Sequence, residues 1–195
     1  VYYTWLLTQP EYFSFICKEI LNVELLPFQL AMIYEMWHRK FPMLIASRGA
    51  SKSFTLGLYC LLRLLLLPNR KIVICGAGFR QSKIIFSYME AIYANAPILR
   101  NILGPDNGPR HDVDTWTFKM NTSIAYAIPI GDGGKIRGLR ANDVIADEFA
   151  SIQKEIFETV ISGFAAVSAN PVQSHQEYAS IQMAKKLSEH IEEEN

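Results

Sequence analysis

Two short, uninterrupted apolar runs constrain this fold more than any other feature of the chain. The runs are MLIA at residues 43–46, followed by a small-residue loop and a Leu-rich helix, and KIVICG at residues 71–76, followed by a segment with apolar residues at helical spacing. A continuous apolar run is typical of a strand that is buried on both faces, as in a parallel sheet. The alternation of strand and helix therefore predicts an α/β fold with a mainly parallel central sheet, flanked by helices on both faces.

The second half of the chain predicts a β-hairpin and one more buried strand. TWTFKM and SIAYAIPI, within residues 115–130, are separated by the polar sequence NTS, which indicates two strands joined by a turn. A glycine-rich basic loop follows at residues 131–142, and DVIADEFA at residues 143–150 then begins as an apolar strand. This third buried strand is expected to end in two carboxylates, Asp147 and Glu148.

Composition narrows the possible functions. The chain has 195 residues, of which 50% are hydrophobic, so one full core is expected. Lys plus Arg equals Asp plus Glu at 19 each, which argues against a strongly basic nucleic-acid binder but leaves a local basic surface open. Cys17, Cys60 and Cys75 lack metal-site spacing and are expected to be reduced core thiols of an intracellular protein. The longest apolar run begins at Leu56 and is too short to cross a bilayer, so no membrane association is expected.

The segment SRGASKS, residues 47–53, lies between the first apolar run and a Leu-rich helix predicted from about Ser53 to Leu67. Phosphate-binding loops have the pattern G-x-x-x-x-G-K-[ST], and here Lys52 and Ser53 match its last two positions, while Ala46 and Ser51 replace the glycines. Loop amides, the positive end of the following helix and the lysine would all attract one phosphate. The alternative is an ordinary strand-to-helix turn with a surface lysine.

The acidic pair after the third apolar run favours the nucleotide interpretation. Asp147 would hold Mg²⁺ together with the hydroxyl of Ser53, and Glu148 would polarise the attacking water. The alternative is that the two carboxylates only begin a helix, where acidic side chains are favoured. Taken together, the two motifs predict a Mg²⁺-dependent nucleoside triphosphatase.

These motifs resemble the N-terminal ATPase domain of the large terminase subunit of tailed bacteriophages. SRGASKS is similar to that family's Walker A loop, and KIRGLRANDVIADEFA is similar to the stretch that leads into its Walker B strand. LPFQLAMI resembles the adenine-recognition segment, and VICGAGFRQSKIIF resembles the segment after the second strand. The likeness covers residues 20–150. It implies an ASCE-type P-loop NTPase, a motor domain that hydrolyses ATP to translocate double-stranded DNA into a procapsid.

The resemblance also implies a domain plan, partners and a location. Residues 1–40 would form an N-terminal helical segment with the adenine-recognition region, residues 41–170 the ATPase core, and residues 171–195 a C-terminal helix or linker towards a nuclease domain expected to be absent. The implied partners are double-stranded DNA, a portal protein, the small terminase subunit and further copies of the chain in an active homo-oligomer. The implied location is the cytoplasm of the infected bacterial host, with none in the mature virion.

Individual site residues follow from the same resemblance. The expected nucleotide-binding residues are Gln29, Ser47, Arg48, Gly49, Ala50, Ser51, Lys52 and Ser53. The expected catalytic residues are Lys52, Glu148 and Arg48, whose guanidinium would neutralise charge on the γ-phosphate. Ser53 and Asp147 are the expected Mg²⁺ ligands. Arg137 and Arg140, in the glycine-rich loop, are candidates for contacting a neighbouring subunit's nucleotide or DNA phosphates.

Each of these assignments has a plainer alternative. Gln29 would then be a solvated polar position on a helix, Arg48 a member of a surface ion pair, and the two loop arginines merely solvated. Two other functions also remain open. One is a nucleotide- or DNA-binding module that does not hydrolyse because Ser51 has spoiled the loop, and the other is a helicase-like ATPase that remodels DNA.

Overall fold

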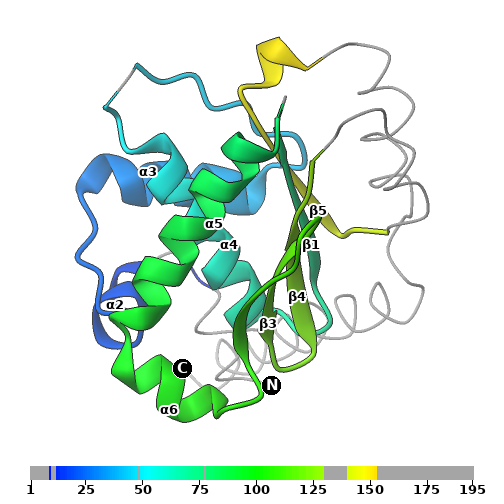
Figure 1. Ribbon diagram of the computed structural model, residues 1–195. Coiled ribbons are helices and arrows are strands. Elements are labelled where there is room, and N and C mark those ends of the chain that lie inside the picture. Colours follow the sequence, from blue (N-terminus) through cyan, green and yellow to red (C-terminus); the bar gives the residue numbers. More distant parts are fainter. Residues whose placement is uncertain (1–8, 10–11, 48, 77, 130–139, 153–195) are drawn as a thin grey trace, which may run out of the picture.

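A five-stranded mixed sheet forms the centre of the protein (Figure 1). The computed structural model describes residues 9, 12–47, 49–76, 78–129 and 140–152. The strands are β1 (Lys71–Gly76), β2 (Gly108–His111), β3 (Trp116–Met120), β4 (Ser123–Ala127) and β5 (Asp143–Asp147), in the spatial order β2-β3-β4-β1-β5. Strand β1 is parallel to β4 and β5, whereas β3 is antiparallel to β2 and β4.

The predicted hairpin is confirmed, and it makes the sheet less parallel than expected. Strands β3 and β4 pair directly, with Met120 opposite Ser123, and β4 then pairs with β1 along its other edge. The hairpin therefore joins the central sheet through β4, which is parallel to β1, and adds β3 in the opposite direction. Strands β4, β1, β5 and also β2 run in one direction, and β3 is the described strand that runs in the opposite direction.

The helices of the described residues lie together on one side of this sheet (Figure 1). They are α2 (Phe13–Glu19), α3 (Pro27–His38), α4 (Lys52–Leu66), α5 (Phe79–Ala94) and α6 (Pro97–Leu103), and a short 3-10 helix, η3 (Phe149–Ser151), follows β5. The predicted Leu-rich helix is thus confirmed as α4. None of these described helices is long and apolar enough to cross a membrane.

The side chains of β1 explain why its sequence is uninterruptedly apolar. Ile72 and Ile74 belong to the main core beneath the helices, while Val73 and Cys75 belong to a second, smaller cluster. Successive side chains of a strand point to opposite faces, so β1 is buried on both. Helices on the second face remain a prediction, because the described helices contribute to the main core.

Helix α4 is held closely against both its neighbours. Gly57 allows α5 to approach, because a Cβ at that position would lie 3.0 Å from the Ile85 carbonyl oxygen and 3.1 Å from Tyr88 Cβ. On its other side, Arg63 forms an ion pair with Asp143 at the start of β5, with Nη2 2.7 Å from Oδ1 and Nε 3.3 Å from Oδ2. Gly57 therefore permits close packing of α4 on α5, and the Arg63–Asp143 pair connects α4 to the sheet.

The prediction of a buried strand at residues 43–46 is wrong. Residues 42–47 form no helix or strand, and Met43 and Ile45 are 76% and 88% exposed. A strand requires a partner for its backbone N–H and C=O groups, and this segment pairs with none of the described strands. The apolar run alone could not reveal this, because pairing depends on distant parts of the chain.

Candidate functional site

The site predicted from the sequence lies where β1 and β5 end. The two strands are parallel, and Gly76 of β1 pairs in register with Asp147 of β5. Their carboxyl ends therefore lie at the same edge of the sheet. In open α/β sheets, ligands bind in the crevice beyond this edge.

Lys52 and Asp147 meet at this edge. Lys52 is the first residue of α4, and its Nζ lies 3.2 Å from Oδ1 of Asp147, the last residue of β5. The lysine side chain is 31% exposed and the aspartate side chain 7%. The phosphate-loop motif and the acidic motif are thus neighbours in space, as the sequence led us to expect. Their roles with a nucleotide remain predictions.

The ion pair places a cation at an unfavourable position of α4. The first turn of a helix carries partial positive charge, so it favours anions over a lysine. Ser51, the N-cap residue, provides no side-chain hydrogen bond to this turn. The Asp147 carboxylate supplies the negative charge here, and a bound phosphate would supply it in the same way.

The backbone of the loop before α4 turns through the left-handed region twice. Gly49 has φ +85°, and a Cβ there would meet nothing within 4 Å. Ser51 has φ +53°, a conformation that costs a non-glycine residue roughly 1–2 kcal/mol. Its carbonyl accepts hydrogen bonds from both the backbone N–H and the hydroxyl of Thr55, each 2.9 Å long. Ser51 therefore adopts the conformation for which the usual motif has glycine.

A backbone hydrogen bond closes the loop before α4. The N–H of Ala50 donates to the carbonyl of Ser47 over 3.3 Å, which closes the turn that precedes α4. Ser53 lies next to Lys52 in the first turn of α4 and is half-buried. Arg48 lies outside the described residues, so its predicted catalytic role stays a prediction.

Asp147 and Glu148 take different positions at the end of β5. One oxygen of Asp147, Oδ1, accepts the Glu148 N–H at 2.9 Å and also contacts Lys52. Glu148 has φ +49° and is exposed. It does precede a short helix, η3, as the plainer alternative expected, but its side chain does not cap that helix. Its carboxylate is therefore available for another partner.

That partner is Gln81, which is not among the predicted site residues. Gln81 lies in the first turn of α5, and its Nε2 is 3.5 Å from Oε2 of Glu148. A signal was present in the sequence, because Gln81 stands three residues after Gly78 at the start of a helix, the position of a capping glutamine. The contact with Glu148 spans two distant segments, and no local pattern could show it.

Gln29 has a role in the fold of α3. The N–H of Leu26 donates to its Oε1 over 3.0 Å, and the residue is only 5% exposed. Pro27 completes this helix start, since the first turn needs no N–H from it. The alternative of a solvated polar position is therefore wrong. Its predicted contact with adenine remains a prediction, with one side-chain oxygen already bonded to the backbone.

The basic residues near the site are unequally placed. Arg140 is exposed shortly before β5, and Arg137 lies outside the described residues.

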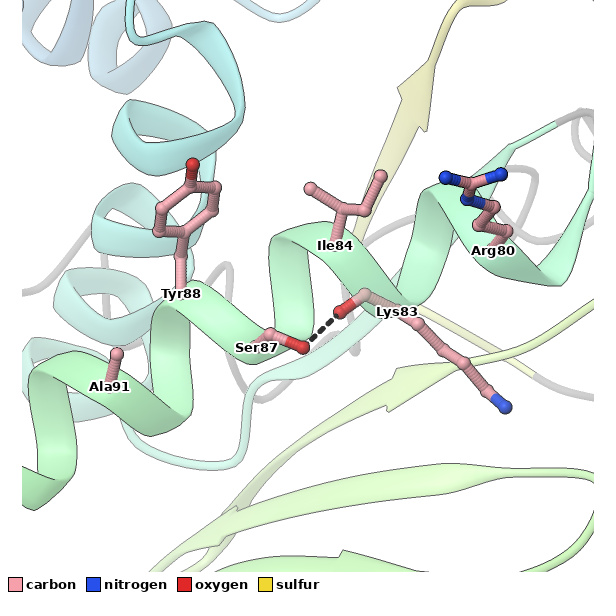
Figure 2. A pocket seen from close by; sticks show the side chains of 6 residues that line it. All are labelled: Arg80, Lys83, Ile84, Ser87, Tyr88 and Ala91. Carbon is pink, nitrogen blue, oxygen red and sulfur yellow. Dashed lines mark hydrogen bonds between the residues drawn. The ribbon is translucent and has the colours of Figure 1, made fainter.

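Arg80 and Lys83 line a shallow hollow of about 360 Å³ on α5 (Figure 2), together with Ile84, Ser87, Tyr88 and Ala91. Figure 2 shows Lys83 pointing away from Arg80, and its Nζ lies 4.2 Å and 4.6 Å from the ring centroids of Phe79 and Trp116. Lys83 is therefore engaged with aromatic rings of its own fold.

Within the described part of the chain, no three His, Cys, Asp or Glu residues are grouped so that they could hold a metal ion. A Mg²⁺ ion bound with a nucleotide needs only one or two protein ligands besides phosphate and water. Ser53 and Asp147 suit that requirement, because each supplies an oxygen and Asp147 ends beside the first turn of α4.

Comparison of the chain with protein-family models, with curated proteins and with solved structures found no match. The geometry of the site and the motifs themselves are therefore the basis for a functional proposal.

Proposed function

We propose that this chain is the ATPase motor domain of a DNA-packaging terminase, which hydrolyses ATP to translocate double-stranded DNA into a procapsid. The observation that supports the ATPase part is the contact between Lys52 and Asp147 at the carboxyl edge of the sheet. The resemblance of SRGASKS and DVIADEFA to the terminase motifs supports the motor part.

In this proposal the residues at the edge of the sheet divide the work. The loop amides and Lys52 would bind the phosphates, with Lys52 turning from Asp147 towards them. Asp147 and Ser53 would hold Mg²⁺, which supplies positive charge to offset the charge of the phosphoryl group. Glu148 would orient the attacking water and accept its proton. Hydrolysis needs little further covalent chemistry, because positioning and charge stabilisation supply most of the catalysis.

The test is ATP turnover by the full chain with Mg²⁺ and double-stranded DNA, compared with its Glu148→Gln variant. We expect turnover to collapse in the variant while nucleotide binding survives, since the carboxylate acts in the chemical step. Full turnover in Glu148→Gln would refute the assignment of the base. Nucleotide binding without turnover in the unmodified chain would favour the non-hydrolysing module, and strand separation would favour the helicase-like ATPase.

A further inference from the structure

We propose that Gln81 is a positioning residue that holds the carboxylate of Glu148 for catalysis. This inference depends on the proposed function, in which Glu148 is the catalytic base. It concerns a residue of α5, an element that contributes none of the predicted catalytic or nucleotide-binding residues.

The orientation of the Gln81 amide follows from its other hydrogen bond. The backbone N–H of Gly78 donates to Gln81 Oε1 over 3.1 Å. A backbone N–H can only donate, so the atom that it meets must be the amide oxygen. The NH₂ group therefore occupies the other branch of the amide, which lies 3.5 Å from Oε2 of Glu148. Gln81 thus links the start of α5 to the end of β5.

Gly76, the last residue of β1, has no side chain and so makes room for Gln81. A Cβ on Gly76 would lie 2.7 Å from Cβ of Gln81 and 3.6 Å from the carbonyl oxygen of Asp147. Contacts below 3.0 Å are essentially never seen for real Cβ atoms, so an alanine at position 76 would force Gln81 to shift. Glycine at this position lets Gln81 approach the carboxylate across the end of the sheet.

Glu148 needs such support more than most carboxylates. Its long side chain is exposed and does not cap η3, so its position is not determined by packing. A donor on one oxygen restricts the carboxylate and leaves its other oxygen for the attacking water. Catalytic hydrogen bonds are often long in a ligand-free site and shorten in the complex with substrate, which fits the 3.5 Å separation.

Gln81→Glu removes the amide donor that faces Glu148 but keeps a side-chain oxygen to cap α5. Glutamate keeps an oxygen for the N–H of Gly78, because either residue can complete this type of helix start. It loses the NH₂ donor and places a second carboxylate against Glu148. We expect kcat for ATP to fall about 10- to 100-fold, as for other residues that orient a functional group, with KM and the unfolding midpoint close to those of the unmodified chain.

Ser87→Glu is the matched control. It adds the same charge to the exposed surface of the same helix, roughly 9 Å further along its axis, and Ser87 bonds only within α5 at the Lys83 carbonyl. We expect its kcat to equal that of the unmodified chain. An equal fall in kcat for Ser87→Glu and Gln81→Glu would overturn the inference, because a general charge effect would then account for both.

Gly76→Ala tests the same contact without changing the chemistry of Gln81. It should lower kcat in the same direction as Gln81→Glu, with nucleotide affinity retained, because it displaces the amide from Glu148. Turnover by the unmodified chain together with unchanged kcat in both variants would overturn the inference alone. Absence of turnover in the unmodified chain would overturn the proposed function, and the inference with it.

Discussion

Two ion pairs join the same helix to the same strand, and they differ in nearly every physical respect. Arg63 pairs with Asp143 at the start of β5, and Lys52 pairs with Asp147 at its end. The two cations are about 16 Å apart along α4 and the two carboxylates about 13 Å apart along β5. Helix and strand therefore run antiparallel, with one ion pair near each end of their contact.

The Arg63–Asp143 pair at the start of β5 is largely buried and makes several contacts. Both side chains are only 13% exposed, and two hydrogen bonds connect the guanidinium to the carboxylate. The guanidinium also lies 4.9 Å from the ring centroid of Trp37 and 5.7 Å from that of Tyr59. The planar guanidinium has several donors, so it can contact both carboxylate oxygens and stack on the aromatic rings. A lysine could not make both kinds of contact.

The pair at the end of β5 is built differently. One contact of 3.2 Å connects a flexible, partly exposed lysine to Asp147. Lys52 is long and partly exposed, so solvent screening and side-chain entropy weaken the pair even though Asp147 is buried. The exposure of the cation and the number of its contacts, rather than charge alone, therefore separate an ion pair that holds the fold from one whose lysine can turn to a ligand.

The largest effect is expected from breaking the buried pair. Arg63→Ala leaves the Asp143 carboxylate buried without its main partner, so we expect a loss of about 3–5 kcal/mol in the free energy of unfolding, measured by urea denaturation. Arg39→Ala is the control, since the Arg39–Glu35 pair has side chains 69% and 57% exposed. It should cost less than about 1 kcal/mol. Equal losses in the two variants would contradict the comparison.

Lys52→Ala should affect ligand binding more than stability. We expect a smaller loss in the free energy of unfolding than for Arg63→Ala, because Asp147 is buried but keeps the hydrogen bond from the Glu148 N–H. The affinity for Mg²⁺-ATP should fall at least about tenfold, equivalent to about 1.4 kcal/mol of binding energy. Calorimetric titration measures the affinity. A large loss of stability with unchanged affinity would show that Lys52 is structural, as Arg63 is.

Ser51→Gly should stabilise the loop slightly. Removing the side chain relieves the cost of φ +53° but gives the unfolded chain more freedom, so a net gain of up to about 1 kcal/mol is expected. Ser47→Gly is the control, because Ser47 does not have a positive φ and glycine there should destabilise. Thermal unfolding measures both. A loss of stability in Ser51→Gly would mean that the serine side chain contributes more than its backbone costs.

The smallest expected effect concerns the reactivity of Cys60, a buried thiol on α4. Burial raises the pKa of Cys60 above its usual value of 9.0, and it raises the pKa of Cys17 and Cys75 to about 12. The reactive thiolate is therefore scarce below pH 9, and labelling by an alkylating reagent should be slow in the folded chain. Arg63→Ala should accelerate labelling of Cys60, read by mass spectrometry, whereas Lys52→Ala should leave it slow. Fast labelling of the unmodified chain would contradict the buried position of this helix.

Much of the fold was predictable because its signals are local. The Leu-rich composition predicted α4, the polar turn predicted the β3–β4 hairpin, and the run at residues 71–76 predicted β1. Gln81 was missed because its contact with Glu148 joins residues far apart in the chain. The strand at residues 43–46 failed for a related reason, since the run had a strand-like composition but no strand to pair with.

The sequence by itself determined which segments are apolar, where helices begin and which residues could serve a phosphate, because these properties depend on near neighbours and side-chain chemistry. Only the tertiary structure decided that Lys52 meets Asp147 and that Gln81 meets Glu148. It also decided that the hairpin joins the sheet through β4, parallel to β1, with β3 reversed beside it. The physical reason is that strand pairing and side-chain contacts between distant segments are set by the packing of the whole core, which no short stretch of sequence contains.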